Sequence, residues 1–507
     1  MMHRSIETAP VHTLLGRRGS EAWAFAAALS LGTLLPSTSR AGDESASPRY
    51  AAGTTSYCVV DTTRGFDVAG GVSDGQRLVL VQAWYPIERR AARRFPLQTF
   101  ADYFAGDREL MLRTERTLLT RSGFSEEVVN ANLIIAEQVF DTPRGSYRDA
   151  PLSRRGGPFP VIVYSHGTLQ QRFTNDAMAE SLAREGYIVL APEHTGNDPL
   201  AAFGAFCPDE LAQPGVVGES LATNPDFDAA RGEYLGDRLE PFFLAGTPDP
   251  TTGTINPVEV ALTLDRVADY RAVLSDARER FGRRARIGRA EVGLIGYSRG
   301  AMHGLVGSEL LPEVGASVAF VGGTPLAFYE RDAEAQPINA ALARASHGAR
   351  DVLDRFTKPV LEIIGGEDTR RKGTTDIAAS MGVYPTPSAD NPSPIVADGF
   401  GRLGETFGVL VQVPRIEHFD FVDDPFVIAY RAPGGATRAG GFDTATTYLS
   451  RSVAERASIR DHFVRELFDR FIPAPGAQPP RSGAPLQNPF EAVGVSVEVN
   501  EPPTDCD

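Results

Sequence analysis

Short apolar runs alternate with amphipathic stretches along most of this 507-residue chain. Residues 159–165 and 187–192 are apolar almost without a break, which predicts strands buried on both faces of a sheet. Residues 175–185 between them predict a helix, with Gly186 as its C-terminal stop. Strand, helix and strand in this order are typical of a mostly parallel sheet with helices on both faces.

The same alternation continues toward the C-terminus. Asn256 caps a helix that begins at Pro257 and runs to about Phe281. Residues 452–472 predict a last helix whose apolar stripe should cover the sheet. Residues 494–499 could pair as an edge strand. Further strands are expected at residues 78–86, 291–295, 316–321, 359–364 and 407–413.

Three segments do not fit the alternation, and they are too long for ordinary connections: about 98–150, 196–255 and 372–406. We expect lids or binding loops there, inserted into one catalytic domain over residues 42–472. Residues 473–507 are rich in Pro and Gly and form a C-terminal extension. Apolar residues 201–206 and 241–245 could line an acyl pocket or contact a lipid surface, although packing against the core is the simpler alternative.

The N-terminus has the pattern of a secretory signal peptide. Arg17-Arg18 precede an apolar segment over residues 22–35, and small residues flank Arg40 before a predicted cleavage after Ala41. An ordinary N-terminal amphipathic helix is the alternative. We therefore expect an exported protein, periplasmic or secreted.

Charge and cysteine content narrow the function classes. The net charge is −15, and removal of residues 1–41, with four Arg and two Glu, would make it −17. This argues against nucleic acid or an anionic membrane surface as a partner. The three cysteines form no C-x-x-C pair. In an oxidising compartment Cys58 could pair with Cys506 and leave Cys207 free, but any of the three pairings is open.

Two G-x-S-x-G pentapeptides are candidates for a nucleophile elbow, a strained turn between a strand and a helix that exposes a serine. Ser298 follows the apolar strand at 291–295 and precedes an apolar helix start at 301–306. Ser73 instead lies in a turn that leads into a strand, which is the reverse order. Ser298 is therefore the candidate nucleophile and Ser73 a loop residue.

A serine nucleophile needs a histidine base, which in such sheets comes after the acid in the chain. His347, His418 and His462 lie downstream, outside the elbow helix. His462 falls within the last helix, and no strand precedes His347. His418 follows the strand that ends near Ile416, where a mobile base is expected, so we predict His418.

The orienting acid is expected after the strand at 359–364, where Glu367 and Asp368 stand. Asp368 is the better candidate because a short carboxylate in a tight turn is placed more rigidly, and turn capping is its alternative role. The natural oxyanion donors are the backbone N–H groups of Thr168 and Arg299.

Three further polar side chains lie close to these residues in the sequence. His166 more plausibly orders the loop before Thr168 than transfers a proton, and His303 is expected to pack beneath the site. The Arg299 side chain could contact an anionic substrate group, but a solvated or salt-bridged arginine is the simpler interpretation.

Several stretches, in this order, resemble the platelet-activating-factor acetylhydrolase and dienelactone-hydrolase-like branch of the α/β-hydrolase superfamily. They span about residues 78 to 425. The resemblance implies an α/β-hydrolase fold, a Ser-Asp-His triad and hydrolysis of carboxylic esters, with Ser298 and His418 as nucleophile and base and Thr168 and Arg299 as oxyanion donors. The stretches that carry it are residues 84–86, 164–167, 182–194, 262–267, 296–301 and 418–421.

The chain departs from this branch in two ways. The acetylhydrolases carry their acid after the strand that corresponds to residues 317–321, where this chain has glycines, so Asp368 must serve. Dienelactone hydrolases use a cysteine nucleophile where this chain has Ser298. Neither phospholipid nor lactone specificity therefore follows from the resemblance.

The sequence thus predicts an exported serine esterase that acts on a small-molecule or lipid ester. It calls for no metal or organic cofactor, because histidine and cysteine show no ligand spacing. Nucleic acid is not expected as a partner, no obligate protein partner is evident, and transient contact with a lipid surface is open. The alternatives are an amide or peptide hydrolase with the same triad and a catalytically silent binding protein of the same fold.

Overall fold

The computed structural model describes residues 48–121, 124–168, 170–198, 200–235, 255–331, 333–366, 393–416, 418–423, 425, 452–477 and 485–502. The expected signal peptide, the candidate acid Asp368 and the cysteine Cys506 lie outside these residues. Among the described helices, none combines the length and the apolar character needed to cross a membrane.

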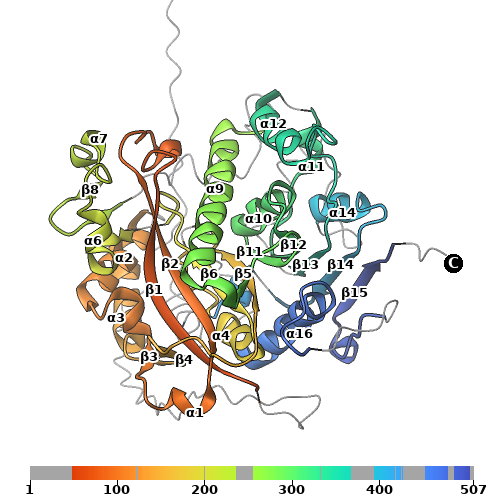
Figure 1. Ribbon diagram of the computed structural model, residues 1–507, viewed down its shortest axis with the longest axis horizontal. Helices are drawn as coiled ribbons and strands as arrows, with labels where there is room; N and C mark the ends of the chain where they lie inside the picture. Colours follow the sequence, from red (N-terminus) through yellow and green to blue (C-terminus); the bar gives the residue numbers. More distant parts are fainter. Residues whose placement is uncertain are drawn as a thin grey trace, which may run out of the picture. The chain divides into compact units, whose positions relative to one another are not determined.

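Six parallel strands form the centre of a 12-stranded sheet (Figure 1). Each corresponds to a strand predicted from an apolar run, so the mostly parallel sheet is confirmed. In spatial order they are β6 (Ile188–Pro192), β5 (Phe159–Ser165), β11 (Val292–Tyr297), β12 (Val314–Phe320), β13 (Val360–Gly365) and β14 (Gly408–Val413).

Antiparallel strands extend the sheet at both edges. Beyond β6 lie β2 (Arg77–Ile87), β1 (Ala51–Asp61), β4 (Pro143–Arg148) and β3 (Leu97–Thr99), of which β1 and β4 run parallel to each other. At the other edge β15 (Ser496–Asn500) pairs antiparallel with β14, which confirms the expected edge strand in the C-terminal extension. The short β10 (Ala285–Arg286) pairs with β5.

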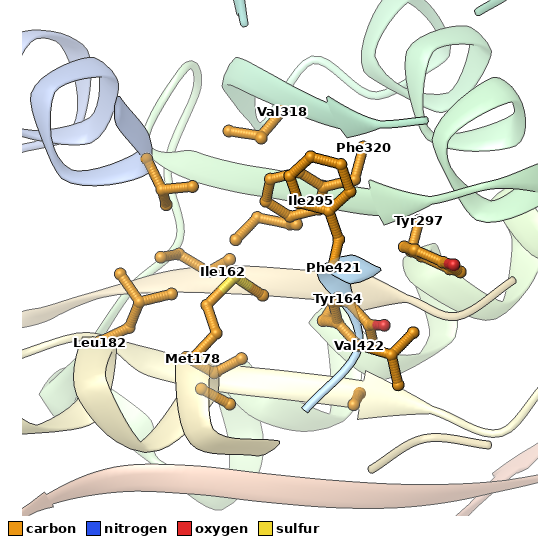
Figure 2. Packing of buried hydrophobic residues seen from close by; sticks show 14 of the residues in the cluster. Ile162, Tyr164, Met178, Leu182, Ile295, Tyr297, Val318, Phe320, Phe421 and Val422 are labelled. Atoms are coloured by element: carbon orange, nitrogen blue, oxygen red, sulfur yellow. The ribbon is translucent and has the colours of Figure 1, made fainter. Parts of the chain in front are cut away.

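Side chains that alternate along the parallel strands build one core on each face of the sheet. On one face Ile162 and Tyr164 belong to the same cluster as residues of α4 (Asp176–Glu185) and α16 (Val453–Phe471). On the other, Val161 and Val163 pack with α9 (Pro257–Arg280) and α10 (Arg299–Leu310). Figure 2 shows the first cluster, with Ile162, Tyr164, Met178, Leu182, Ile295, Tyr297, Val318, Phe320, Phe421 and Val422.

The helix boundaries follow their capping residues. Gly186 ends α4 in the left-handed region, at a φ of 114°. The Asn256 side chain accepts a hydrogen bond from the Val258 amide at the start of α9, with Pro257 at the first helical position. Ser452 caps α16 in the same way through the Glu455 amide.

The three long segments contain secondary structure of their own. Residues 98–150 form two helices and also return a strand, β4, to the main sheet, so this segment is more than a surface lid. Its other elements are η2 (Phe100–Phe104), α2 (Arg108–Arg121) and α3 (Glu126–Val139). The described end of the third segment forms α14 (Pro394–Gly401).

The second segment forms a small unit with its own three-stranded sheet and a separate hydrophobic cluster against β1 and β2. Phe203 is fully buried there, with its ring edge-on to Phe66, so residues 201–206 do pack against the core. Ala202 and Phe206 also line a cavity with Phe173. Residues 241–245 lie outside the described residues. The elements are β7 (Ala201–Ala202), α5 (Phe203–Phe206), α6 (Pro208–Leu211), α7 (Glu219–Ala222), β8 (Phe227–Asp228) and β9 (Glu233–Tyr234).

The remaining elements are short and connect the main ones. They are η1 (Val68–Gly70), α1 (Arg89–Ala92), η3 (Gly282–Arg284), α11 (Leu326–Arg331), η4 (Ala333–Ala335), α12 (Gln336–Ala345), η5 (His418–Phe421) and η7 (Glu491–Val493).

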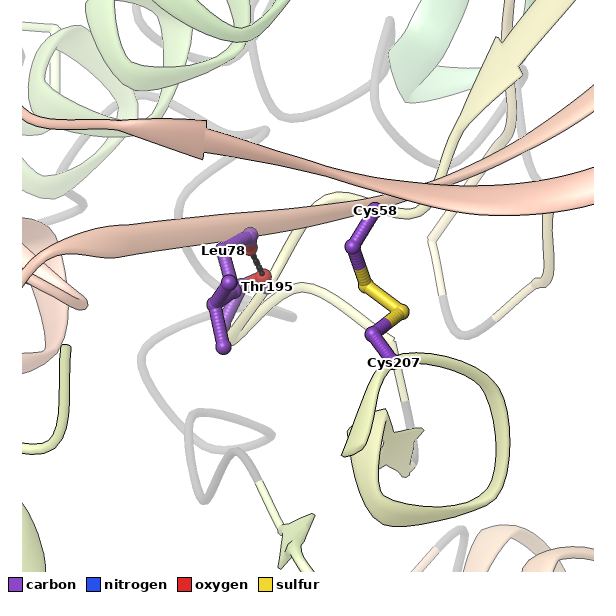
Figure 3. The surroundings of a disulfide bond; sticks show 4 residues. All are labelled: Cys58, Leu78, Thr195 and Cys207. Carbon is purple, nitrogen blue, oxygen red and sulfur yellow. Dashed lines mark hydrogen bonds between the residues drawn. A yellow bond between two sulfur atoms is a disulfide. The ribbon is translucent and has the colours of Figure 1, made fainter. Parts of the chain in front are cut away.

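A disulfide between Cys58 and Cys207 ties the second segment to β1 (Figure 3). The expected pair of Cys58 with Cys506 is therefore wrong. Both sulfurs lie in the buried cluster between β1 and α5, because Cys58 points to the face that this segment covers. Close by, the Thr195 hydroxyl donates to the Leu78 carbonyl at 2.6 Å and fixes the start of the segment to β2.

Candidate active site

Ser298 lies in a tight turn between β11 and α10, as the sequence predicted. Its φ of 54° and ψ of −119° lie in a region that residues with a side chain rarely adopt. A Cβ at Gly296 would lie 2.2 Å from the Gly300 carbonyl oxygen, and one at Gly300 would lie 2.2 Å from the Ser165 carbonyl oxygen. Gly296 and Gly300 are therefore both needed, since a side chain at Gly296 would collide with the first turn of α10 and one at Gly300 with the end of β5. Ser73 lies in the loop before β2, also as predicted.

His418 reaches Ser298 from the segment after β14. Its Nε2 lies 2.8 Å from Ser298 Oγ, which is hydrogen-bonding distance. The Tyr297 hydroxyl donates to the His418 carbonyl at 2.6 Å. Because Tyr297 directly precedes Ser298 at the end of β11, this bond also ties the His418 segment to the elbow. His418 is buried, whereas Ser298 is partly exposed and can be reached by a substrate.

Two arginines of α16 hold the segment that carries His418. Arg456 donates to the backbone carbonyl and the carboxylate of Asp420, both at 2.7 Å. Arg460 donates to the Asp423 carboxylate at 2.8 Å. The sequence analysis missed both residues. The sequence feature that could have pointed to them is a pair of arginines four positions apart on an otherwise apolar helix face. Arginines are unusual in such a place unless each has a buried partner.

The other candidate histidines have different surroundings. His462 lies on α16 with its Nε2 3.0 Å from the Gln487 carbonyl oxygen. His347 lies in the turn after α12 and is exposed. Among the described histidines, His418 is the one within hydrogen-bonding distance of the Ser298 hydroxyl.

The strand that precedes the candidate acid runs against the His418 segment. β13 ends at Gly365, and a Cβ there would lie 2.4 Å from the Ile416 carbonyl oxygen. Gly365, two residues before Glu367, therefore lies next to the backbone of Ile416, which is two residues before His418. Glu367 and Asp368 themselves lie outside the described residues, so the role of Asp368 stays a prediction.

The loop after β5 brings Thr168 close to Ser298. A Cβ at Gly167 would lie 2.9 Å from Tyr297 Cδ1 and 3.1 Å from Ser298 Cβ, so a glycine is needed for the loop to approach. Thr168 follows and is partly exposed. The other expected donor, the Arg299 amide, comes directly after Ser298 at the start of α10. The Arg299 guanidinium is buried 3.5 Å from Glu259, which bears out the salt-bridged interpretation of this side chain.

A second Ser-His-Asp chain lies beneath this loop. Ser165 Oγ is 3.1 Å from His194 Nε2, and His194 Nδ1 is 2.9 Å from Asp269 Oδ2. All three residues are fully buried, so a substrate cannot reach Ser165. The Ser165 hydroxyl also accepts hydrogen bonds from Tyr270 at 2.7 Å and Arg266 at 3.2 Å. This cluster is therefore structural, and it fixes the end of β5.

The charge states in this cluster follow from its burial. Burial, with the nearby Arg266, lowers the pKa of His194 to about 3, so the imidazole is neutral and can accept from Ser165 while donating to Asp269. Burial opposes the charge of Asp269, but Arg64 and Arg77 outweigh it and hold the pKa of this carboxyl well below its usual range. Sequence analysis assigned no role to Arg266 or His194, although both lie in stretches that carry the family resemblance.

His166 orders the loop, as expected. Its Nδ1 lies 2.8 Å from the Gly167 carbonyl oxygen, and its Nε2 accepts from the His194 amide at 3.2 Å. Arg266 donates to the His166 carbonyl at 2.6 Å. Burial lowers the pKa of His166 well below its usual value, so it is neutral.

His166, Glu193 and Asp198 bring buried ligand atoms within 4.8 Å of one another, the one such group among the described residues. Arg172 occupies both oxygens of Glu193, through its amide at 3.2 Å and its guanidinium at 2.7 Å. The two nitrogens of His166 are engaged as well. A cation would have to displace these contacts and approach a guanidinium, so we assign no metal here.

His303 packs beneath the elbow, as expected. It is fully buried in α10, and its Nε2 contacts the Glu259 carboxylate on α9. Arg299 contacts the same carboxylate. Burial, partly offset by Glu259, lowers the pKa of His303 to about 4. This group links the two helices that cover one face of the sheet.

Comparisons with known proteins agree with this geometry. Residues 122–218 match the family model described as platelet-activating factor acetylhydrolase, isoform II. No curated protein sequence matches the chain. The structure of a ferulic acid esterase from Streptomyces cinnamoneus superposes with a TM-score of 0.51 at 19% identity, over 90% of this chain and 98% of the esterase. This chain therefore has the α/β-hydrolase fold, and the resemblance to the acetylhydrolase branch is supported.

Replacement of His303 should change how stability depends on pH. Between pH 6.5 and 4 the unfolded chain binds a proton at His303 that the folded protein does not, so the free energy of unfolding falls as the pH falls. His303→Gln keeps a donor for Glu259 but removes this titration. We expect the loss of stability on acidification to become shallower by about 1 kcal/mol per pH unit, measured by urea unfolding at pH 6.5, 5.5 and 4.5. Equal pH slopes in the two proteins would contradict the assignment.

Proposed function

We propose that this chain is an exported serine esterase in which Ser298, His418 and Asp368 form the catalytic triad. One observation carries the proposal: the Ser298 hydroxyl, held in a strained elbow, lies 2.8 Å from His418 Nε2. A serine hydroxyl is a weak nucleophile at neutral pH, and a neutral imidazole at this distance can take its proton during attack.

Each step of the reaction has a residue to perform it. Ser298 Oγ attacks the ester carbonyl carbon while its proton passes to His418 Nε2, and the Thr168 and Arg299 amides stabilise the oxyanion. The C–O bond to the alcohol then breaks, and the alcohol leaves with the proton from His418. Water, deprotonated by His418, hydrolyses the acyl-enzyme and restores Ser298. Asp368 holds the imidazole tautomer in which Nε2 accepts.

The comparisons support a carboxylic ester hydrolase. The matched family is named for an acetylhydrolase and the matched structure for an esterase, both of which cleave esters by name. A small-molecule or lipid ester is therefore the substrate class that we propose.

Export is supported by two features that do not depend on each other. Residues 1–41 have the pattern of a secretory signal peptide. The Cys58–Cys207 disulfide is a type of bond that forms and persists in oxidising compartments such as the periplasm or the medium.

Replacement of the nucleophile tests the proposal. We expect the protein without residues 1–41 to hydrolyse p-nitrophenyl esters, in a series from acetate to palmitate, and Ser298→Ala to lose at least 10³-fold in kcat because no covalent intermediate can form. Ser73→Ala, in the other G-x-S-x-G pentapeptide, is the matched control and should keep full activity. The chain length with the highest kcat/KM would show the size of the acyl pocket.

A wild-type protein that hydrolyses no ester in the series and resists a fluorophosphonate label would overturn the triad and favour the silent binding protein. Cleavage of anilides at rates equal to those of esters would favour the amide hydrolase.

The acid can be identified by paired substitutions in the turn after β13. Asp368→Asn should lower kcat by about 10³–10⁴-fold, since the amide cannot stabilise the imidazolium and favours the wrong tautomer. Glu367→Gln removes the neighbouring carboxylate and should change kcat less than threefold. Steady-state kinetics with p-nitrophenyl acetate distinguishes the two, and the reverse pattern would assign the acid to Glu367.

A further inference from the structure

We propose that Gln170 is a further catalytic residue, whose side-chain Nε2 donates a third hydrogen bond to the oxyanion formed at Ser298. The inference rests on the proposed esterase function and deepens it. No sequence motif pointed to Gln170, which is one of two adjacent glutamines in the loop after β5.

One hydrogen bond fixes the direction of the Gln170 amide. The Gly167 backbone N–H donates to Gln170 Oε1 at 3.2 Å. A backbone N–H can only donate, so the side-chain atom that faces it must be the oxygen. The Nε2 group, with its two donor hydrogens, is therefore the other end of the amide.

The Gln170 amide and the nucleophile lie at the same side of Gly167. The position of a Cβ on Gly167 is 2.7 Å from Gln170 Oε1 and 3.1 Å from Ser298 Cβ. Both side chains thus pack against Gly167, which leaves no room for a Cβ between them, and the Gln170 amide lies beside Ser298. An oxyanion formed at Ser298 develops a few ångströms from Ser298 Cβ and therefore close to this amide.

Exposure shows that the Gln170 side chain is on the solvent-facing side of the loop. Thr168, Gln170 and Ser298 are each partly exposed, whereas Ser165 and His166 beneath them are fully buried. Gln170 and Ser298 can therefore both be reached from solvent, whereas the residues beneath them cannot.

The Gly167 amide holds the Gln170 side chain in place. The Gly167 amide is engaged with Gln170 Oε1 and is not directed at the oxyanion. That contact orients the side chain before substrate arrives, so donation from Nε2 costs little conformational entropy at the transition state.

The isosteric variant Gln170→Glu separates donation from loop support. The glutamate still offers an oxygen to the Gly167 amide, but a negative oxygen replaces Nε2. We expect kcat/KM for p-nitrophenyl acetate at pH 8 to fall about 10²–10³-fold, mainly through kcat, with KM within about threefold of wild type. The ratio of variant to wild-type activity should rise as the pH falls toward about 4.3, where a protonated glutamate can donate again.

Two further variants serve as controls. Gln213→Glu introduces the same charge at an exposed position after α6 and should leave activity unchanged. Gln170→Met keeps the length without either polar atom and should also lose kcat. Thermal unfolding of each variant shows whether it is folded.

The outcomes separate this inference from the proposed function. Gln170→Glu or Gln170→Met with more than half of the wild-type kcat/KM at pH 8 would overturn the role of Gln170. A loss for Gln170→Glu that is the same at every pH would also overturn it, because a distorted loop has no reason to recover on acidification. An inactive wild type that also escapes fluorophosphonate labelling would instead overturn the esterase itself.

Discussion

The contact on which the site depends is between two backbones, the end of β5 and the first turn of α10. Gly300 lies so close to the carbonyl oxygens of Ser165 and His166 that a Cβ would meet them at 2.2 and 2.5 Å. This approach places the loop with Gly167 and Thr168 against Ser298. A serine in a strained turn and a loop that offers N–H donors become one site only because no side chain separates them.

Buried polar groups keep that contact in place. Arg266 and Tyr270 of α9 donate hydrogen bonds to the end of β5, and His194 and Asp269 complete a network that ends in Arg77. Ions in such a position are expensive to desolvate, and removal of one partner leaves the others uncompensated. Buried arginines also support the segment that carries His418, where Arg456 and Arg460 donate to Asp420 and Asp423. Ser298 is therefore partly exposed, while His418 and the residues that support both groups are buried.

The sequence predicted the parts of the fold that rest on local pattern. Continuous apolar runs predicted all six parallel strands, and Asn256 and Gly186 marked helix ends by their own capping chemistry. The strand β1 was missed because residues 51–61 mix Thr, Ser and Gly with apolar residues, as suits a strand covered unevenly on its two faces. The disulfide partner of Cys58 was wrong because pairing depends on where the second long segment folds back, which no local pattern records.

At the site, chain order and the strand–turn–helix context sufficed to predict an elbow at Ser298, rather than at Ser73, with His418 beside it. The roles of His194 and Arg266 were not predictable, because these residues act through contacts between elements distant in sequence. A lone buried arginine in a helix has no signature beyond its unexpected place on an apolar face. Gln170 likewise gained a role only when its amide was found across Gly167 from the nucleophile.

The central claim is that the Ser298 hydroxyl carries the acyl group during turnover. The most direct measurement is acid quench within the first turnover of p-nitrophenyl acetate, followed by peptide mapping of the protein-bound acetyl group. The account predicts one acetyl group per chain, on the peptide that contains Ser298, formed together with a burst of p-nitrophenol. Acetylation at Ser73 or Ser165, or turnover without acetyl on Ser298, would contradict it.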